Sequence, residues 1–203
     1  MREVELTIQI LEELDTIIEK LENQGFKLIE KYYMKDYYMI HKSVDLNTDN
    51  YNILKKCLLI RNIIDDDPKK YLTYKNKTYD EKGKIISQNK IKSKIESIED
   101  TKRMLELVDF VTLFEVENNS IVYKKNNIEI VVQNITNPKG VYIEIEATEE
   151  ELMKYNDEEV KDILKKKLDT LQLKTTDDYE VKKAIIALNQ KLIFDGEKSS
   201  EIS

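Results

Sequence analysis

Charged side chains recur at every second position in several segments of this 203-residue chain. Alternate residues of a β-strand point to the same face, so each segment would gather its charges on one face of a strand. Such faces could bind a charged ligand. The segments contribute Glu3 with Glu5, Arg61, Lys75 beside Thr73, the set of Lys90, Lys92, Lys94 and Glu96, Glu115 with Glu117, and Glu144 with Glu146.

Two arrangements could explain these charged faces. An amphipathic sheet could turn each of them to bulk water, which is the simpler account of any single strand. For all the strands together, a sheet whose apolar face packs against helices would bring the charged faces together inside a barrel. We therefore predict a barrel whose charged interior is a binding site.

The elements that position these residues follow from hydrophobic periodicity. Residues 2–10 alternate as a half-buried strand, and residues 11–24 show helical spacing that ends before Gly25. The aromatic and branched segment 26–44 predicts one or two strands, and residues 45–52 predict a loop. A helix is predicted from Asp100 to Phe110. Further strands are predicted over 57–64, 70–77, 85–97, 112–125, 128–135 and 140–148, a tight hairpin turn at Asn126 and Asn127, and closing helices over 149–173 and 176–194.

Length and composition favour one soluble α+β domain over residues 1–195, with a disordered tail at 196–203. The net charge of −7 argues against a protein that binds duplex nucleic acid. No run of 18 apolar residues occurs and the first residues lack a signal-peptide pattern, so we expect a cytoplasmic protein that does not enter a membrane. Cys57 and His41 are the single residues of their types, which excludes an internal disulfide and a Cys/His zinc site. Neither residue is assigned a role.

Five segments carry a resemblance to a known family. EVELT at 3–7 is similar to an E-x-E-x-K signature, KDYY at 35–38 to a DTYY-like strand, and LLIR at 58–61 to LRIR. LTYK at 72–75 and YIEIEA at 142–147 are similar to two further strands, the latter to a closing FVEIE strand. In order and spacing, residues 2 to about 147 resemble the CYTH, or triphosphate-tunnel, superfamily, most closely its branch of class IV adenylyl cyclases and thiamine triphosphatases.

The resemblance implies a closed or nearly closed antiparallel eight-stranded β-barrel with flanking helices. In that tunnel Arg and Lys hold a triphosphate while Glu side chains bind Mg²⁺ or Mn²⁺, which suits the preference of these ions for carboxylate and phosphate oxygens. The implied ligand is ATP, thiamine triphosphate or inorganic polyphosphate. The implied metal ligands are Glu3, Glu5, Glu144 and Glu146, and the implied phosphate contacts are Arg61, Lys75, Lys90, Lys92 and Lys94.

Four positions depart from the family pattern. Thr7 stands in place of a Lys, Leu59 in place of an Arg, Ser120 within a segment that usually carries cations, and Gln133 near the place of an Asp. The functional alternatives therefore stay open. They are a metal-dependent adenylyl cyclase or triphosphate hydrolase, a phosphate- or nucleotide-binding module without turnover, and a protein-interaction scaffold. A homodimer is also left open, and no catalytic residue is assigned.

Overall fold

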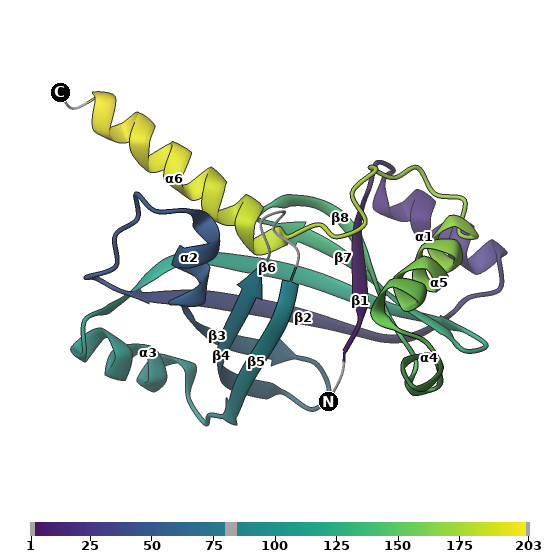
Figure 1. Cartoon of the computed structure of the whole chain (residues 1–203), viewed down its shortest axis with the longest axis horizontal. Coiled ribbons are helices and arrows are strands. Elements are labelled where there is room, and N and C mark those ends of the chain that lie inside the picture. Colours follow the sequence, from purple (N-terminus) through teal and green to yellow (C-terminus); the bar gives the residue numbers. More distant parts are fainter. Residues whose placement is uncertain (1–2, 80–84, 202–203) are drawn as a thin grey trace. The chain divides into compact units, whose positions relative to one another are not determined.

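A computed structural model describes residues 3–79 and 85–201, with side chains described for residues 3–75 and 89–193. Its strands form one eight-stranded sheet in the order β1-β8-β7-β6-β2-β3-β4-β5 (Figure 1). The strands are β1 (Glu5–Ile10), β2 (Lys27–His41), β3 (Leu58–Ile64), β4 (Lys69–Tyr79), β5 (Ile85–Lys94), β6 (Phe110–Lys125), β7 (Ile128–Thr136) and β8 (Lys139–Glu146). The helices are α1 (Leu14–Asn23), α2 (Asn50–Lys55), α3 (Ile98–Leu107), α4 (Glu149–Lys154), α5 (Asp157–Asp169) and α6 (Lys183–Glu201).

The predicted α+β class is confirmed, as is the eight-stranded antiparallel sheet with flanking helices. In the described part of the chain, no strand pairing joins the end strands β1 and β5. The sheet is thus not closed by hydrogen bonds, which is compatible with the predicted tunnel. The segment predicted as one or two strands over 26–44 is the single strand β2.

The chain divides into two compact units. The first unit contains Met1–Tyr32 and Asn118–Lys182, and the second contains Tyr33–Glu117 and Lys183–Ser203. The prediction of one domain over residues 1–195 stays a prediction. Helix α6 continues to Glu201, so residues 196–201, predicted as a disordered tail, are helical, and residues 202 and 203 lie outside the described residues.

In the first unit, one face of the sheet is apolar and is covered by helices. Leu6 and Ile8 alternate along β1 and are buried together with Ile17 of α1 and Leu164 of α5. Figure 1 shows α1 and α5 beside β1 in this unit. Each buried Leu or Ile contributes roughly 1.5–3 kcal/mol. The polar residues of β1 must therefore lie on the opposite face of the sheet.

Strand β1 is at the end of the sheet, and residues 174–181 of the same unit cover its outer edge. The amide of Leu11 donates to the carbonyl of Lys174 at 2.8 Å, and the amide of Val181 donates to the carbonyl of Thr7 at 3.0 Å. The prediction of a helix from residue 176 is wrong for these residues, because their backbone groups bond to β1 instead of to one another. Helix α6 begins only at Lys183.

The predicted helix over 149–173 is two helices, because an Asn interrupts it. Asn156 accepts hydrogen bonds from the amides of Glu158 and Glu159 and begins α5 with a capping box. Thr148 begins α4 in the same way with Glu151. Ser, Thr, Asn and Asp side chains favour these first positions because they satisfy amides that have no partner within the helix. Gly25 and Asn126 have positive φ at the predicted helix end and hairpin turn.

In the second unit, helix α3 covers one face of the sheet. Met39 of β2 and Ile60 of β3 are fully buried with Ile98 of α3. Helix α2 was missed and its beginning was predicted as loop, since six residues give little periodicity. Asp49 caps α2 through the amide of Asn52.

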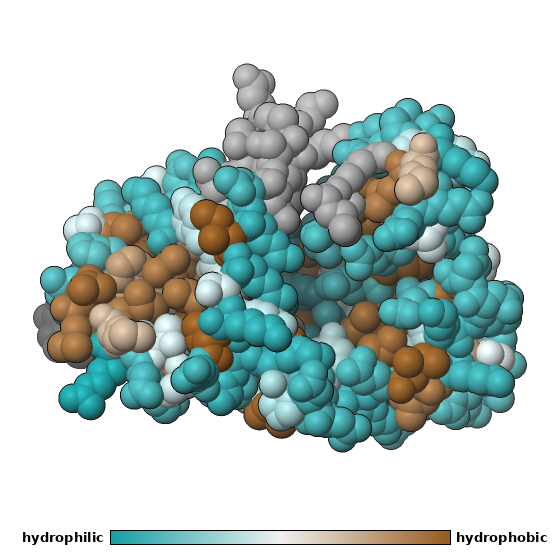
Figure 2. Space-filling model, turned by 90° about the horizontal axis from the view of Figure 1, so that it is seen from below, coloured by the Kyte–Doolittle hydropathy of each residue, from teal (hydrophilic) through white to brown (hydrophobic). Residues whose placement is uncertain are grey.

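Exposed apolar side chains gather at the end of α3 and the beginning of β6, and include Met104, Leu107, Val108 and Val111. Figure 2 shows an apolar surface on the side of the view where α3 lies in Figure 1. None of the helices that the structure describes combines the length and the apolar character needed to cross a membrane. The cytoplasmic location stays a prediction.

Candidate functional site

The predicted metal ligands lie on two paired strands of the first unit. In the register of β1 with β8, Glu5 lies opposite Glu146 and Thr7 lies opposite Glu144. Residues directly opposite in an antiparallel pair share a face, and so do alternate residues of one strand. Glu5, Glu144 and Glu146 therefore share the face that the helices leave uncovered. Glu3 is exposed two residues before Glu5.

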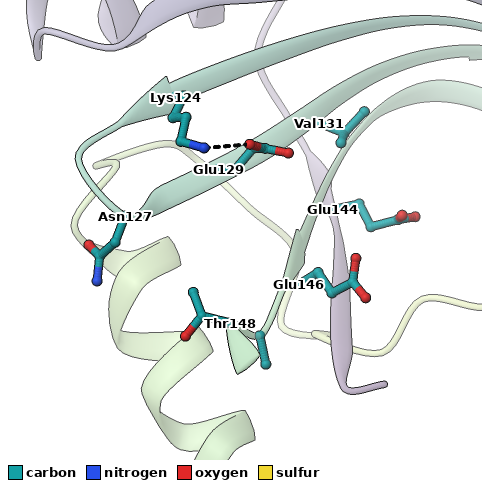
Figure 3. Close-up of a pocket in the computed structure, with 8 residues that line it drawn as sticks. Lys124, Asn127, Glu129, Val131, Glu144, Glu146 and Thr148 are labelled. Atoms are coloured by element: carbon teal, nitrogen blue, oxygen red, sulfur yellow. Dashed lines mark hydrogen bonds and ion pairs between the residues drawn. The ribbon is translucent and has the colours of Figure 1, made fainter. Parts of the chain in front are cut away.

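A hollow of about 250 Å³ opens beside these carboxylates within the first unit. In Figure 3, Glu144 and Glu146 extend from β8 to the same side. Glu129 of β7 also borders the hollow and forms an ion pair with Lys124 across the β6–β7 hairpin, at 3.1 Å. The hollow is lined by Lys124, Asn127, Glu129, Val131, Glu144, Glu146, Ala147 and Thr148.

Glu129 was missed in the sequence. The signal that could have found it is its place two residues after the predicted Asn126–Asn127 turn, where a hairpin puts it opposite Lys124. It adds a third acidic side chain to the hollow, beside Glu144 and Glu146. The acidic character of this region therefore extends from β8 to β7.

These carboxylates are chemically suited to a divalent cation, but they are too few to complete its coordination shell. A bound ligand would have to supply the remaining oxygen atoms. Within the described residues, no group of three or more His, Cys, Asp or Glu side chains is close enough to hold a metal ion. Mg²⁺ is usually bound through one or two carboxylates, with water and substrate phosphate oxygens completing its octahedron. Glu5 and Glu146 lie opposite each other on paired strands, and Glu144 lies two residues from Glu146 on the same face of β8. These side chains can offer carboxylates of that kind.

The predicted phosphate contacts share one face of the second unit. Arg61 lies opposite Tyr71, and Tyr71 lies opposite Lys94. Lys75 lies opposite Lys90 on the same two strands. Arg61, Lys75, Lys90, Lys92 and Lys94 are thus on one side of the sheet, and the core residues Met39 and Ile60 are on the other. Their contact with phosphate stays a prediction.

Asp36 holds Arg61 in a fork of two hydrogen bonds. The Arg61 Nε donates to Asp36 Oδ1 at 2.8 Å and Nη2 donates to Oδ2 at 2.7 Å. Asp36 is only 3% exposed, so its carboxylate depends on this pair. Two of the five guanidinium N–H groups are committed to Asp36, which fixes the plane of the Arg61 side chain. Asp36 lies in the KDYY segment but was not assigned a role from the sequence.

The three predicted lysines of β5 are exposed on an edge strand. The Lys92 ammonium lies 3.6 Å from the centroid of the Tyr71 ring, a cation–π contact. Lysines on an edge strand also discourage pairing with another chain. The positions of these lysines are therefore compatible both with phosphate binding and with protection of the edge.

The expectation that all the charged strand faces converge is wrong for Glu115 and Glu117. Both carboxylates pair with the Lys35 ammonium at 2.8 Å. Lys35 directly precedes Asp36 in β2, so it points to the opposite face from Arg61. Its hydrogen bond holds the pKa of Glu117 below the ordinary value, and the two carboxylates raise the pKa of Lys35.

All four substituted positions are buried. Thr7, Ser120 and Gln133 are buried in the first unit, and Leu59 is buried two residues before Arg61 in the second. Ser120 lies opposite Gln133 in the register of β6 with β7. The first unit therefore has neutral side chains where the family pattern implies charge. Cys57 is also buried, which raises the pKa of its thiol to about 12 and makes it a poor nucleophile.

The comparisons with known proteins agree with this architecture. No protein-family model matches the chain. A candidate adenylate cyclase of Methanocaldococcus jannaschii is 26% identical over 148 residues, covering 73% of this chain and 78% of that protein.

Two solved structures share the fold over nearly the whole chain. Protein PH1819 of Pyrococcus horikoshii has a TM-score of 0.66 at 22% identity and covers 96% of this chain and 99% of its own. A candidate adenylyl cyclase from Hippeastrum, described as revealing a dominant triphosphatase activity, has a TM-score of 0.63 at 16% identity, covering 93% and 96%. The resemblance drawn from the sequence is thereby confirmed, and the chain has the fold of the CYTH, or triphosphate-tunnel, superfamily.

Proposed function

We propose that this protein binds a triphosphate-containing small molecule. The observation that carries the proposal is the strand register. It gathers the predicted cations on one face of the second unit and the predicted carboxylates on one face of the first. Lys75 and Arg61, with the lysines of β5, would neutralise phosphate oxygens. Glu3, Glu5, Glu144 and Glu146 would hold Mg²⁺ or Mn²⁺.

The reaction that this arrangement supports best is attack on a triphosphate. It would either cyclise ATP to cyclic AMP or hydrolyse a nucleoside, thiamine or inorganic triphosphate. Such reactions need little covalent participation from the protein, because positioning and charge neutralisation lower most of the barrier. A bound divalent ion would supply Lewis-acid polarisation of phosphate oxygens. Arg61 in its fork with Asp36 presents a cation of fixed orientation, and Lys75 presents a point charge.

Two similar proteins support the proposal. The archaeal relative is a candidate adenylate cyclase, and the Hippeastrum protein is described with a triphosphatase activity. Their folds do not distinguish cyclase from hydrolase, since one fold can host both reactions. The substrate must therefore be tested directly.

Turnover should depend on the acidic face. Purified protein is incubated with ATP, thiamine triphosphate and tripolyphosphate, each with Mg²⁺ and with Mn²⁺. We expect one substrate to be consumed. The double variant Glu5→Gln, Glu144→Gln should consume it about 100-fold more slowly, because neutral amides replace two carboxylates that would hold the ion. Chelation with EDTA should have the same effect. Equal rates for both proteins with every substrate would contradict the enzymatic proposal.

A specific observation favours a second candidate function, ligand binding without turnover. Thr7, Ser120 and Gln133 are neutral and buried on the face of the acidic set. A tunnel protein that lacks these charges could keep its affinity for a polyanion and lose the chemistry. Calorimetry that shows binding of a triphosphate without product would support this candidate. If no triphosphate bound at all, a protein-interaction scaffold would explain the charged faces better. The homodimer stays a prediction.

A further inference from the structure

A row of uncharged polar side chains crosses four neighbouring strands of the first unit. Ser120 of β6 lies opposite Gln133 of β7, Gln133 lies opposite Tyr142 of β8, and Tyr142 lies opposite Gln9 of β1. Asn118 lies two residues before Ser120 on the same strand. Because Gln9 and Tyr142 alternate with Glu5 and Glu144, the row is on the face that carries the predicted metal ligands.

Most of the row is buried although its members are polar, and only Gln9 is partly exposed. Asn118, Ser120 and Tyr142 are each 1% exposed. Gly140 leaves room for the polar ends of the row, since a Cβ there would lie 3.0 Å from Gln9 Nε2 and 3.3 Å from the Tyr142 hydroxyl. Burial raises the pKa of Tyr142, so its hydroxyl remains a neutral donor. The row thus combines donors and acceptors without a formal charge.

Two oxygen atoms of this row have no hydrogen-bond partner among the described residues: Asn118 Oδ1 and Ser120 Oγ. A buried polar atom without a partner is costly, and native proteins retain few of them. An amide oxygen can only accept, so the partner of Asn118 Oδ1 must carry an N–H or O–H group. The phosphoryl oxygens of a triphosphate cannot be that partner.

The distance along β8 from the neutral row to the carboxylates suits a ligand with a phosphate end and an uncharged end. Tyr142 precedes Glu144 by two residues and Glu146 by four, which is roughly 7 Å and 13 Å of strand. A ligand whose phosphates and metal ion meet the carboxylates would bring its remaining part to the neutral row. A nucleoside or an aminopyrimidine has donors of the required kind.

We propose that Asn118, Ser120 and the neighbouring Gln133, Tyr142 and Gln9 form a neutral subsite. It takes the uncharged part of an organic triphosphate through amine or hydroxyl donors. The ligand class is therefore an organic triphosphate with N–H or O–H groups, and inorganic tripolyphosphate would leave Asn118 Oδ1 without a partner. This inference rests on the proposed function, because it assumes that phosphates bind beside the carboxylates.

The test compares ligands that do and do not carry such donors. Calorimetric titrations with Mg²⁺ are run with ATP, thiamine triphosphate and tripolyphosphate on the wild type, Asn118→Leu and Ser120→Ala. We expect Asn118→Leu to weaken binding of an organic triphosphate about tenfold, and Ser120→Ala about threefold, with tripolyphosphate affinity unchanged. The melting temperature of ligand-free Asn118→Leu should equal or exceed that of the wild type, since it removes a buried unpartnered amide. Thr101→Val is the control, because Thr101 is a buried threonine of α3 in the second unit, away from the row, and we expect this variant to leave every affinity unchanged.

Each other outcome is decisive. If the wild type binds no triphosphate, both the proposed function and the subsite are overturned. If triphosphates bind but the variants change all affinities equally or none, the subsite alone is overturned and the two oxygens hold water. Binding of tripolyphosphate without binding of either organic triphosphate would also overturn the subsite. Ser120→Ala decides the matter even if Asn118→Leu fails to fold, because it removes only one oxygen atom.

Discussion

Arg61 shows how a single acidic side chain can prepare a cation for ligand binding. Asp36 is buried and accepts two hydrogen bonds from the guanidinium, so Arg61 cannot rotate freely. A long cationic side chain normally loses conformational entropy when it binds phosphate. In this protein the fork with Asp36 already restricts the Arg61 side chain in the folded state, so less conformational entropy remains to be lost on binding.

Replacing Asp36 by Asn should therefore destabilise the protein. The amide cannot match both charged hydrogen bonds, and we expect the free energy of unfolding to fall by about 1.5–3 kcal/mol in urea denaturation. Asp67→Asn is the matched control, because Asp67 is exposed and pairs with Lys69 at 3.4 Å, where we expect no measurable loss. Equal losses for the two variants would show that the fork does not stabilise the fold.

At the scale of elements, one ion pair joins α4 to α5 in the first unit. The Lys167 ammonium lies 2.6 Å from Glu151 Oε1, and both side chains are 14% exposed. Burial acts to raise the pKa of Glu151, but hydrogen bonds from Lys167 and from the Thr148 backbone outweigh it and keep the pKa below its ordinary value. The pair therefore favours the ionised form of Glu151 in the folded protein.

This lowered pKa fixes the sign of a pH dependence. A carboxyl group whose pKa is lower in the folded state stabilises the protein above its unfolded pKa, and the contribution disappears as the pH falls through the folded pKa. We expect the difference in unfolding free energy between the wild type and Lys167→Met to be largest near pH 6 and to shrink below about pH 4.5. Urea denaturation at several pH values measures it. A difference that stays constant from pH 6 to pH 3 would contradict this assignment.

The elements that could be predicted from the sequence are those with strong local signals. The alternation of β1, the glycine after α1 and the Asn turn between β6 and β7 are local, and the structure has them. The late start of α6 could not be predicted, because the competing hydrogen bonds come from β1, which is distant in sequence. Helix propensity gives no information about such a partner.

In the candidate site, too, the features with local signals could be predicted from the sequence, and those that depend on distant partners could not. Alternation within one strand correctly grouped the lysines of β5 and the glutamates of β8. The pairing register decides which side chains of neighbouring strands share a face of the sheet. The sequence of a single strand does not reveal that register. For this reason Glu115 and Glu117 were placed with the wrong face, and Asp36 was not connected with Arg61.

At the scale of the whole molecule, the proposed triphosphate would bind through the charged faces of the sheet. Lys75 belongs to the LTYK segment and shares its face with Arg61 and the lysines of β5. Because Lys75 lies beside other cations, its removal should leave the fold stable while it removes a charge-assisted contact worth roughly 1.5–3 kcal/mol.

The measurement that tests this claim most directly is a calorimetric titration of the wild type and Lys75→Ala with ATP, thiamine triphosphate and tripolyphosphate. We predict that the wild type binds at least one of them and that Lys75→Ala weakens this binding about tenfold or more, with an unchanged melting temperature. Equal affinity in both proteins, or no binding of any triphosphate to the wild type, would contradict the claim.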